Sequence, residues 1–222
     1  MKPGEVILLS PYDAVYIEVP KVACTSLKMA FAALLDIDLA ASDGDPHQAA
    51  FPFTAPSVDP HGRLFPGLFA FAFVRNPWDR LVSCYRDKIA GEVEGFTHFA
   101  IRPGVADCLA PFEAFSANMS FEAFVDAVAS IPDTNADAHF RSQYTFLTNE
   151  AGEDAVDFVG RFEHLSRDFE RVKRHAHLPN LMLSRYQAAS RQVNYADYYT
   201  PRTREVVAER FKTDVWLFDY RF

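Results

Sequence analysis

The sequence repeats one local pattern: a short apolar run, then a polar turn, then a run with helical spacing. In the first copy, residues 15–19 are mostly apolar, and residues 20–28 carry the turn and the start of a predicted helix. In the second copy, residues 69–74 are apolar and residues 75–88 follow in the same way. Short runs rich in aromatic and β-branched residues are typical of buried strands. Strands that alternate with helices predict an α/β fold, in which a central, mostly parallel sheet is flanked by helices on both faces.

Both turns carry groups that bind anions. Lys21 lies in the first turn, and the hydroxyls of Thr25 and Ser26 stand at the predicted start of the helix. In the second copy, Arg75 directly follows the strand, and Ser83 lies off the apolar stripe of the next helix. A helix N-terminus adds backbone N–H groups and a partial positive charge. Two such junctions in one chain of 222 residues indicate a ligand with phosphate-like groups at both ends.

The rest of the chain continues the alternation. Further helices are expected at about 120–130, 165–177 and 200–212, with a third core strand at 157–162 and a strand or arm within 1–13. Residues 36–67 and 91–119 are expected to be mainly loops. Trp78 and Trp216 are expected in the core, and Asn76 is expected to cap the helix that ends near residue 89. We expect one domain over residues 1–222.

Charge and cysteine content exclude several classes of protein. The formal net charge is −8, whereas a general nucleic-acid binder is usually basic, so basic groups must be concentrated locally to bind a polyanion. The three cysteines form no CxxC pair, which argues against a disulfide framework or a zinc site, and we expect no metal. No apolar run reaches the ~20 residues that span a bilayer, and no signal peptide is recognised. We therefore expect a cytoplasmic protein without an integral membrane segment.

Each motif also has a plainer explanation. Serine and threonine are common at helix starts, so the first turn can be an ordinary capped helix. Arg75 can pair with a carboxylate, and Ser83 can simply be solvated. The pattern G-x-x-x-x-G-K-[ST] of a P-loop is absent, because no glycine lies between Pro20 and Lys28 and the lysine comes early.

Taken together, the two segments resemble a known family. P-K-V-A-C-T-S-L-K at 20–28 and F-V-R-N-P-W-D-R-L-V-S-C-Y-R-D-K at 73–88 are similar to the nucleotide-binding segments of sulfotransferases that use 3′-phosphoadenosine 5′-phosphosulfate (PAPS). The chain looks most like the carbohydrate sulfotransferase branch of chondroitin and HNK-1 type, sulfotransferase family 2. Weaker similarity continues through 137–140, 157–163 and 198–220. The resemblance implies a P-loop-like sulfotransferase fold and sulfuryl transfer from PAPS to a carbohydrate or glycolipid hydroxyl, or another small hydroxyl acceptor. Adenosine 3′,5′-bisphosphate (PAP) is the product.

The resemblance also implies roles by position. Lys21 is expected to contact the phosphosulfate and to offset charge on the leaving phosphate oxygen. Arg75 and Ser83 are expected to hold the 3′-phosphate. The 5′-phosphate is expected on the backbone and hydroxyl groups of Val22, Ala23, Cys24, Thr25, Ser26 and Leu27. The family chemistry requires no metal.

A general base should take the proton of the acceptor hydroxyl, and related enzymes use a histidine or a glutamate. His47 is our first candidate, His61 the second and His139 the third, each with a surface histidine of no special role as the alternative. A P-loop-type kinase that uses ATP and a non-catalytic nucleotide-binding protein remain as alternative functions. The sequence leaves the acceptor and the oligomeric state open.

Overall fold

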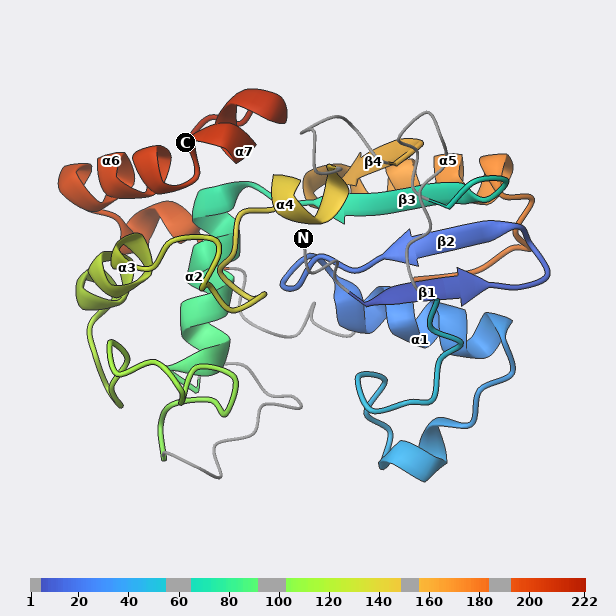
Figure 1. Cartoon of the computed structure of the whole chain (residues 1–222), viewed down its shortest axis with the longest axis horizontal. Coiled ribbons are helices and arrows are strands. Elements are labelled where there is room, and N and C mark those ends of the chain that lie inside the picture. Colours follow the sequence, from blue (N-terminus) through green and yellow to red (C-terminus); the bar gives the residue numbers. More distant parts are fainter. Residues whose placement is uncertain (1–4, 55–64, 92–102, 149–155, 184–192) are drawn as a thin grey trace. The chain divides into compact units, whose positions relative to one another are not determined.

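The computed structural model describes residues 5–54, 65–91, 103–148, 156–183 and 193–222 (Figure 1). Two compact units are present, and each is built from two separate parts of the chain. The first, which we call the sheet unit, consists of Met1–Arg75 and Gln143–Tyr186. The second, which we call the helical unit, consists of Asn76–Ser142 and Gln187–Phe222.

The sheet unit contains a four-stranded sheet in the order β1-β2-β3-β4 (Figure 1). β2 and β3 are parallel, as are β3 and β4, whereas β1 is an antiparallel edge strand. The expected mostly parallel sheet is therefore confirmed, and an antiparallel edge strand is common in such sheets. The elements of this unit are β1 (Val6–Leu9), β2 (Ala14–Ile17), α1 (Cys24–Leu34), η1 (Leu39–Ser42), β3 (Phe69–Val74), α4 (Tyr144–Leu147), β4 (Phe158–Arg161), η2 (Phe162–His164) and α5 (Leu165–His175).

An aromatic layer joins α1 and α5 to one face of the sheet. Tyr16 of β2 lies opposite Phe71 of β3, and Phe31 of α1 packs on both, with ring centroids 5.3 and 6.2 Å away. Phe31 also meets Phe169 of α5 at 6.3 Å. Both helices therefore cover the same face. Side chains of the opposite face, such as Val15, are fully buried as well, so the sheet is enclosed on both sides.

The segment after α1 is attached to the outer edge of the sheet. Residues 36–67 were expected to be loop, and the only helix in their described part is the short η1. The amide of Leu8 donates to the carbonyl of Pro52 at 2.8 Å, and that of Thr54 donates to Val6 at 3.0 Å. Ile7 and Phe53 form an isolated antiparallel bridge. The loop is thus fixed along β1.

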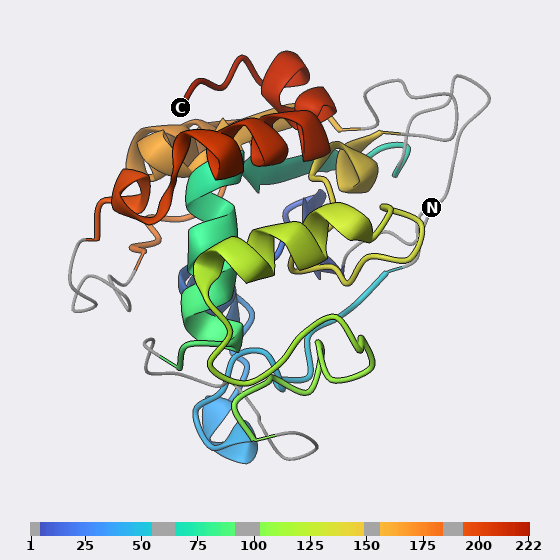
Figure 2. The same cartoon turned by 90° about the vertical axis from the view of Figure 1, so that its left-hand side faces the viewer.

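The helical unit consists of α2 (Pro77–Lys88), α3 (Phe121–Ser130), η3 (Tyr195–Tyr198), α6 (Pro201–Arg210) and α7 (Lys212–Leu217). In Figure 2 the yellow-green α3 runs beside the red α6. Arg202 of α6 links them, with hydrogen bonds of 2.8 Å to Glu122 and to Asp126. Beneath this pair, Phe124 is fully buried and packs on Tyr85 of α2.

Capping residues set the helix starts as the sequence predicts. The side chain of Asn76 accepts a hydrogen bond from the amide of Trp78 at 3.0 Å, and Ser120 accepts one from Ala123 at 3.2 Å. Thr200 and Thr203 form a reciprocal capping box at the start of α6. Each cap satisfies amides that have no partner inside the helix.

The end of the chain differs from the expectation. The helix expected at 200–212 ends at Arg210, and a separate α7 follows. Trp78 is buried, but the expectation that Trp216 lies in the core is wrong, because Trp216 is 80% exposed. In α7 the buried positions are Asp214 and, just beyond its end, Phe218. Trp216 lies midway between Asp214 and Phe218 in the sequence, so its side chain points to the opposite side of the helix.

No helix among the described residues is long and apolar enough to cross a membrane.

Candidate active site

The turn between β2 and α1 has a strained backbone without any glycine. Lys21 and Ala23 both adopt left-handed conformations, with φ of 69° and 56°. Such conformations are costly for residues with a Cβ and are concentrated at functional sites. Ala23 occupies the N-cap of α1 and provides no side-chain hydrogen bond. The first-turn amides of α1 therefore receive no side-chain cap, which leaves them suited to an anion.

Arg75 joins the second predicted segment to the first. Because β2 and β3 are adjacent and parallel, their carboxyl ends lie at the same edge of the sheet, where ligands bind in such folds. The Arg75 guanidinium donates to the carbonyl of Lys21 at 3.1 Å and lies 4.2 Å above the Phe162 ring. The structure thus brings together the two basic residues that the sequence singled out.

Gln143 fixes the backbone beneath this guanidinium. Its side-chain oxygen accepts from the Arg75 amide at 2.9 Å, and its side-chain nitrogen donates to the Arg75 carbonyl at 2.8 Å. Gln143 is completely buried. Sequence reasoning missed this residue because a glutamine in a polar segment gives no signal of such pairing.

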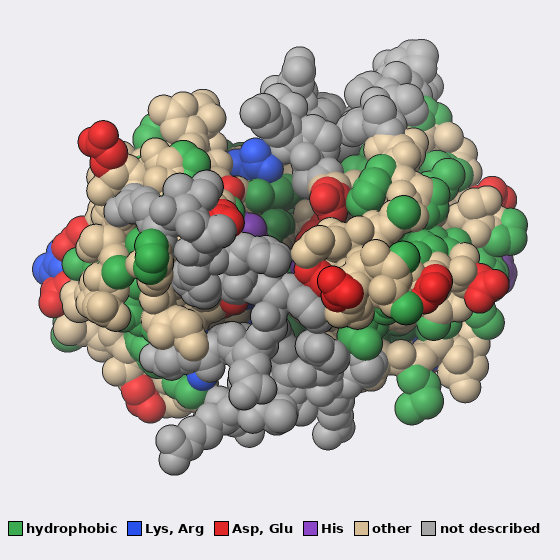
Figure 3. Space-filling view, turned by 90° about the horizontal axis from the view of Figure 1, so that it is seen from below, with side chains coloured by type: hydrophobic (Ala, Val, Ile, Leu, Met, Phe, Trp, Pro, Cys, Tyr) green, Lys and Arg blue, Asp and Glu red, His purple; other side chains and the backbone are tan. Residues whose placement is uncertain are grey.

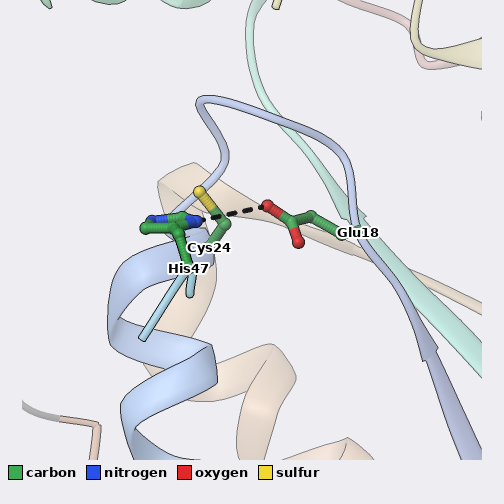
Figure 4. A group of neighbouring side chains, drawn as sticks. All are labelled: Glu18, Cys24 and His47. Atoms are coloured by element: carbon green, nitrogen blue, oxygen red, sulfur yellow. Dashed lines mark ion pairs between the residues drawn. The ribbon is translucent and has the colours of Figure 1, made fainter. Parts of the chain in front are cut away.

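His47 reaches the same turn from the loop after α1. Its Nε2 lies 3.0 Å from the Thr25 hydroxyl. Its Nδ1 lies 3.9 Å from Glu18 Oε1 (Figure 4). Its backbone amide donates to the Asp45 carboxylate at 2.8 Å, which fixes the turn that presents the ring. Its side chain is one-third exposed. His47, the first base candidate from the sequence, therefore lies against the turn between β2 and α1.

Of the other two histidine candidates, the structure describes only His139. His139 belongs to the helical unit, where its Nδ1 is 2.7 Å from the Asp137 carboxylate two residues earlier. His61 lies outside the described residues.

The family assignment follows from a match over nearly the whole chain. The model of the sulfotransferase family matches residues 5–221. The chain belongs to the sulfotransferase family. It is therefore a transferase of sulfuryl groups, and both predicted nucleotide segments lie within the match. No curated protein and no solved structure matches it.

An ion-pair cluster centred on the buried Lys28 lies beside the first turn of this sulfotransferase. Lys28 of α1 lies 2.7 Å from a carboxylate oxygen of Glu18 and 2.7 Å from one of Glu5. Burial of Lys28 tends to lower its pKa, but the two carboxylates outweigh burial and raise it. Burial and the neighbouring Cys24 raise the pKa of Glu18 to about 8 despite the opposing effect of Lys28. Sequence reasoning missed Glu18, although its one signal was present: a carboxylate inside an otherwise apolar run.

Among the residues that the structure describes, two groups of side chains combine atoms of the types that bind metals. They are Glu18, Cys24 and His47 in the sheet unit, and Cys108, Asp137 and His139 in the helical unit, each with its atoms within 4.8 Å of one another. Burial, with help from Asp137, raises the pKa of Cys108 to about 11, so this thiol is protonated at neutral pH. We assign no ion to either group, and the expectation of no metal stays a prediction.

The remaining predicted residues of the sulfotransferase are placed as follows. In the first turn, Val22 and Leu27 are buried, whereas Ala23, Cys24, Thr25 and Ser26 are partly exposed. Ser83 lies on α2 in the helical unit and is partly exposed.

Surface charge agrees with the acidic composition. On the face shown in Figure 3, acidic side chains are spread widely and basic ones show in few places. The basic groups at the carboxyl ends of β2 and β3 are therefore a local feature of an acidic molecule.

Proposed function

We propose that this sulfotransferase takes its sulfuryl group from PAPS and transfers it to a hydroxyl of a carbohydrate, a glycolipid or another small acceptor, with PAP as product. The observation that carries the proposal is the hydrogen bond between Arg75 and the Lys21 carbonyl. It brings Arg75 of the second segment to Lys21 of the first at one edge of the sheet, which supports a ligand with phosphates at both ends of its ribose.

The roles of the residues follow from charge. Lys21 would bind the phosphosulfate and offset the negative charge that grows on the leaving phosphate oxygen. The amides and hydroxyls of residues 22–27 would hold the 5′-phosphate at the start of α1. Arg75 and Ser83 would bind the 3′-phosphate, for which a guanidinium offers charge-assisted hydrogen bonds. Like phosphoryl transfer, the reaction then depends on positioning and electrostatic stabilisation.

His47 is the proposed general base. A base must come within hydrogen-bond reach of the proton that it removes, and Nε2 of His47 already lies beside Thr25 at the proposed phosphosulfate turn. The Thr25 hydroxyl carries a single proton, which it can give either to Nε2 or to a phosphate oxygen. Binding of the donor would therefore draw the hydroxyl to the phosphate and leave Nε2 for the acceptor.

The wider setting is also a proposal. The match over residues 5–221 supports a single, P-loop-like sulfotransferase domain over residues 1–222. We place the protein in the cytoplasm and its acceptor among neutral sugars or glycolipids, because the net charge of −8 disfavours a highly sulfated acceptor and nucleic acid.

The test combines binding with transfer. Calorimetry should show that PAP binds more tightly than ATP, since only PAP carries the 3′-phosphate. Incubation with ³⁵S-labelled PAPS and a panel of neutral saccharides and glycolipids should then label one acceptor class. Tighter binding of ATP would favour a kinase, and PAP binding without transfer to any acceptor would favour a non-catalytic nucleotide-binding protein.

A further inference from the structure

At the proposed active site, the His47 ring lies between the Thr25 hydroxyl and the Glu18 carboxylate, and Figure 4 shows its contact with Glu18. The two ring nitrogens of His47 face different partners: Nδ1 faces the Glu18 carboxylate at 3.9 Å, and Nε2 faces the Thr25 hydroxyl at 3.0 Å. A carboxylate only accepts hydrogen bonds, whereas a hydroxyl can donate or accept. The 3.9 Å contact is longer than a hydrogen bond, but the charge of the ionised carboxylate favours the neutral ring with its proton on Nδ1, toward Glu18, and with the lone pair of Nε2 toward the turn.

Glu18 is held in place independently of His47. One of its carboxylate oxygens pairs with Lys28 at 2.7 Å, and the other is the oxygen that faces His47. The Glu18 side chain is 8% exposed and that of Lys28 is 2% exposed. Glu5 adds a second carboxylate to Lys28, so the ammonium is anchored from two sides. A carboxylate fixed in this way acts over a short distance with little screening by solvent.

We propose that Glu18 is the positioning residue of His47, holding the imidazole in the Nδ1–H form and stabilising its imidazolium as the acceptor proton arrives. The proposal rests on the proposed function, since it assigns Glu18 to the reaction in which His47 is the base. A residue in this place acts through the histidine and touches neither substrate.

The proton and electron balance is simple. The acceptor O–H proton moves to Nε2 of His47 while the acceptor oxygen forms a bond to sulfur. The bond between sulfur and the bridging phosphate oxygen breaks, and its electrons remain on PAP. The resulting imidazolium keeps its Nδ1 proton toward Glu18 and afterwards returns the Nε2 proton to solvent. Nothing is oxidised or reduced, and no other reactant is needed.

The pH dependence follows from the groups around Glu18. Burial and the neighbouring Cys24 raise the pKa of Glu18, whereas Lys28 and His47 lower it. Tyr16, on the strand that precedes Glu18, has its pKa raised by burial and by the Glu18 charge. The active state needs an ionised Glu18 and a neutral His47. It therefore forms only at a pH at which the Glu18 carboxyl and the His47 imidazolium have each lost one proton. Loss of the carboxylate should therefore shift the acid limb of kcat to lower pH.

The first experiment needs no substrate. Above about pH 8, where Glu18 is ionised, the ¹⁵N-histidine NMR spectrum of the full chain should show neutral His47 with its proton on Nδ1. Glu18→Gln keeps an acceptor but removes the charge, so the tautomer should persist while the pKa of His47 falls. Glu18→Leu removes the acceptor too, and the Nδ1–H preference should be lost. Circular dichroism and thermal melts check that both variants fold. A proton on Nε2 in the wild type, or an unchanged His47 pKa in Glu18→Gln, would overturn the proposal.

The second experiment uses the transfer reaction. In Glu18→Gln, kcat should fall about 10- to 100-fold, as for other groups that orient a functional histidine. Its acid limb should move to lower pH, with KM for PAPS nearly unchanged. In a His47→Gln background, Glu18→Gln should have little further effect; full additivity of the two losses would overturn the proposal. If the NMR results hold but no acceptor is sulfated, the pair stands and the proposed function fails.

Discussion

At the scale of single residues, two lysines of one motif have different environments. Lys21 occupies the strained turn and is partly exposed. Lys28 is buried between Glu18 and Glu5. The same residue type therefore has two settings: Lys21 is exposed enough to meet a ligand, as we propose, whereas Lys28 pairs with the buried Glu18 and the exposed Glu5.

Substitution of the two lysines should separate these roles. Lys21→Ala should lower kcat strongly with little change in the free energy of unfolding, because its charge matters most as the leaving group departs. Above about pH 8, where Glu18 is ionised, Lys28→Met should lower the free energy of unfolding by about 3 to 5 kcal/mol, because it leaves a buried carboxylate without its partner. Urea denaturation and initial rates measure both effects. A Lys21→Ala enzyme with wild-type kcat would remove Lys21 from the mechanism.

Glu18 should make the protein less stable as pH rises. Its pKa in the folded protein is about 8, above the ordinary value of 4.5, so between these values the folded state holds a proton that the unfolded state has lost. The contribution of Glu18 to the free energy of unfolding is thus fully present below about pH 4.5 and is lost as the pH rises through about 8. The total loss is at most about 5 kcal/mol. Urea denaturation from pH 5 to pH 8.5 should show this decline in the wild type and a flatter profile in Glu18→Gln. Parallel profiles would show that Glu18 does not titrate in this range.

At the scale of elements, close packing rather than propensity decides residue identity in β4. Gly160 pairs with Phe73 in the register of β3 and β4. A Cβ at Gly160 would lie 2.4 Å from the Phe73 ring, which is itself buried. Only glycine leaves room for that ring.

Gly160→Ala should therefore destabilise the sheet. We expect a loss of about 1 to 3 kcal/mol in the free energy of unfolding, which is typical of overpacking a tight core. Phe73→Leu should relieve the clash, so the double variant should lose less than the sum of the single variants. Additive losses in urea denaturation would argue that the clash is not the cause.

In the helical unit, Arg80 ties α2 to the segment before α4. Its guanidinium donates to the carbonyls of Arg141 and Ala138 at 2.8 and 2.9 Å, and it is 3% exposed. Burial lowers the pKa of Arg80 to about 10, partly offset by Asp214, so it stays charged at neutral pH. Arg80 lies within the segment that resembles the nucleotide-binding motif, yet these contacts are structural.

Arg80→Met should cost about 2 to 4 kcal/mol of the free energy of unfolding, because two carbonyls lose their donor. The matched control is Arg202→Met, which removes an exposed arginine and should change stability much less. Thermal and urea denaturation would compare the two. Equal losses would contradict the role assigned to Arg80.

At the scale of the whole molecule, an acidic protein must concentrate positive charge to hold a nucleotide with phosphates at both ends of its ribose. PAP should therefore stabilise the fold, by about 2.7 kcal/mol at a hundredfold excess over its Kd. Adenosine 5′-phosphate should stabilise it less, and added salt should weaken binding of PAP. In Arg75→Ala the difference between the two nucleotides should shrink. Thermal melts with each nucleotide measure this, and an unchanged difference would place the 3′-phosphate away from Arg75.

The local signals in the sequence were enough for most of the elements. Asn76, Ser120 and Thr200 each cap the helix that the sequence predicted, because a cap depends only on neighbouring residues. The apolar run 69–74 became β3 without change. Trp216 was misplaced because the break after Arg210 begins a new helix and changes which side faces inward.

By itself, the sequence determined the strand–turn–helix pattern, the basic residues in each turn and the resemblance to the sulfotransferase family. Only the tertiary structure decided which groups meet. Parallel pairing of β2 and β3 brings Arg75 to Lys21, and attachment of the loop along β1 accompanies the approach of His47 to Glu18 and Thr25. The physical reason is that capping and periodicity act over a few residues, whereas burial, ion pairing and pKa depend on segments that are distant in the chain.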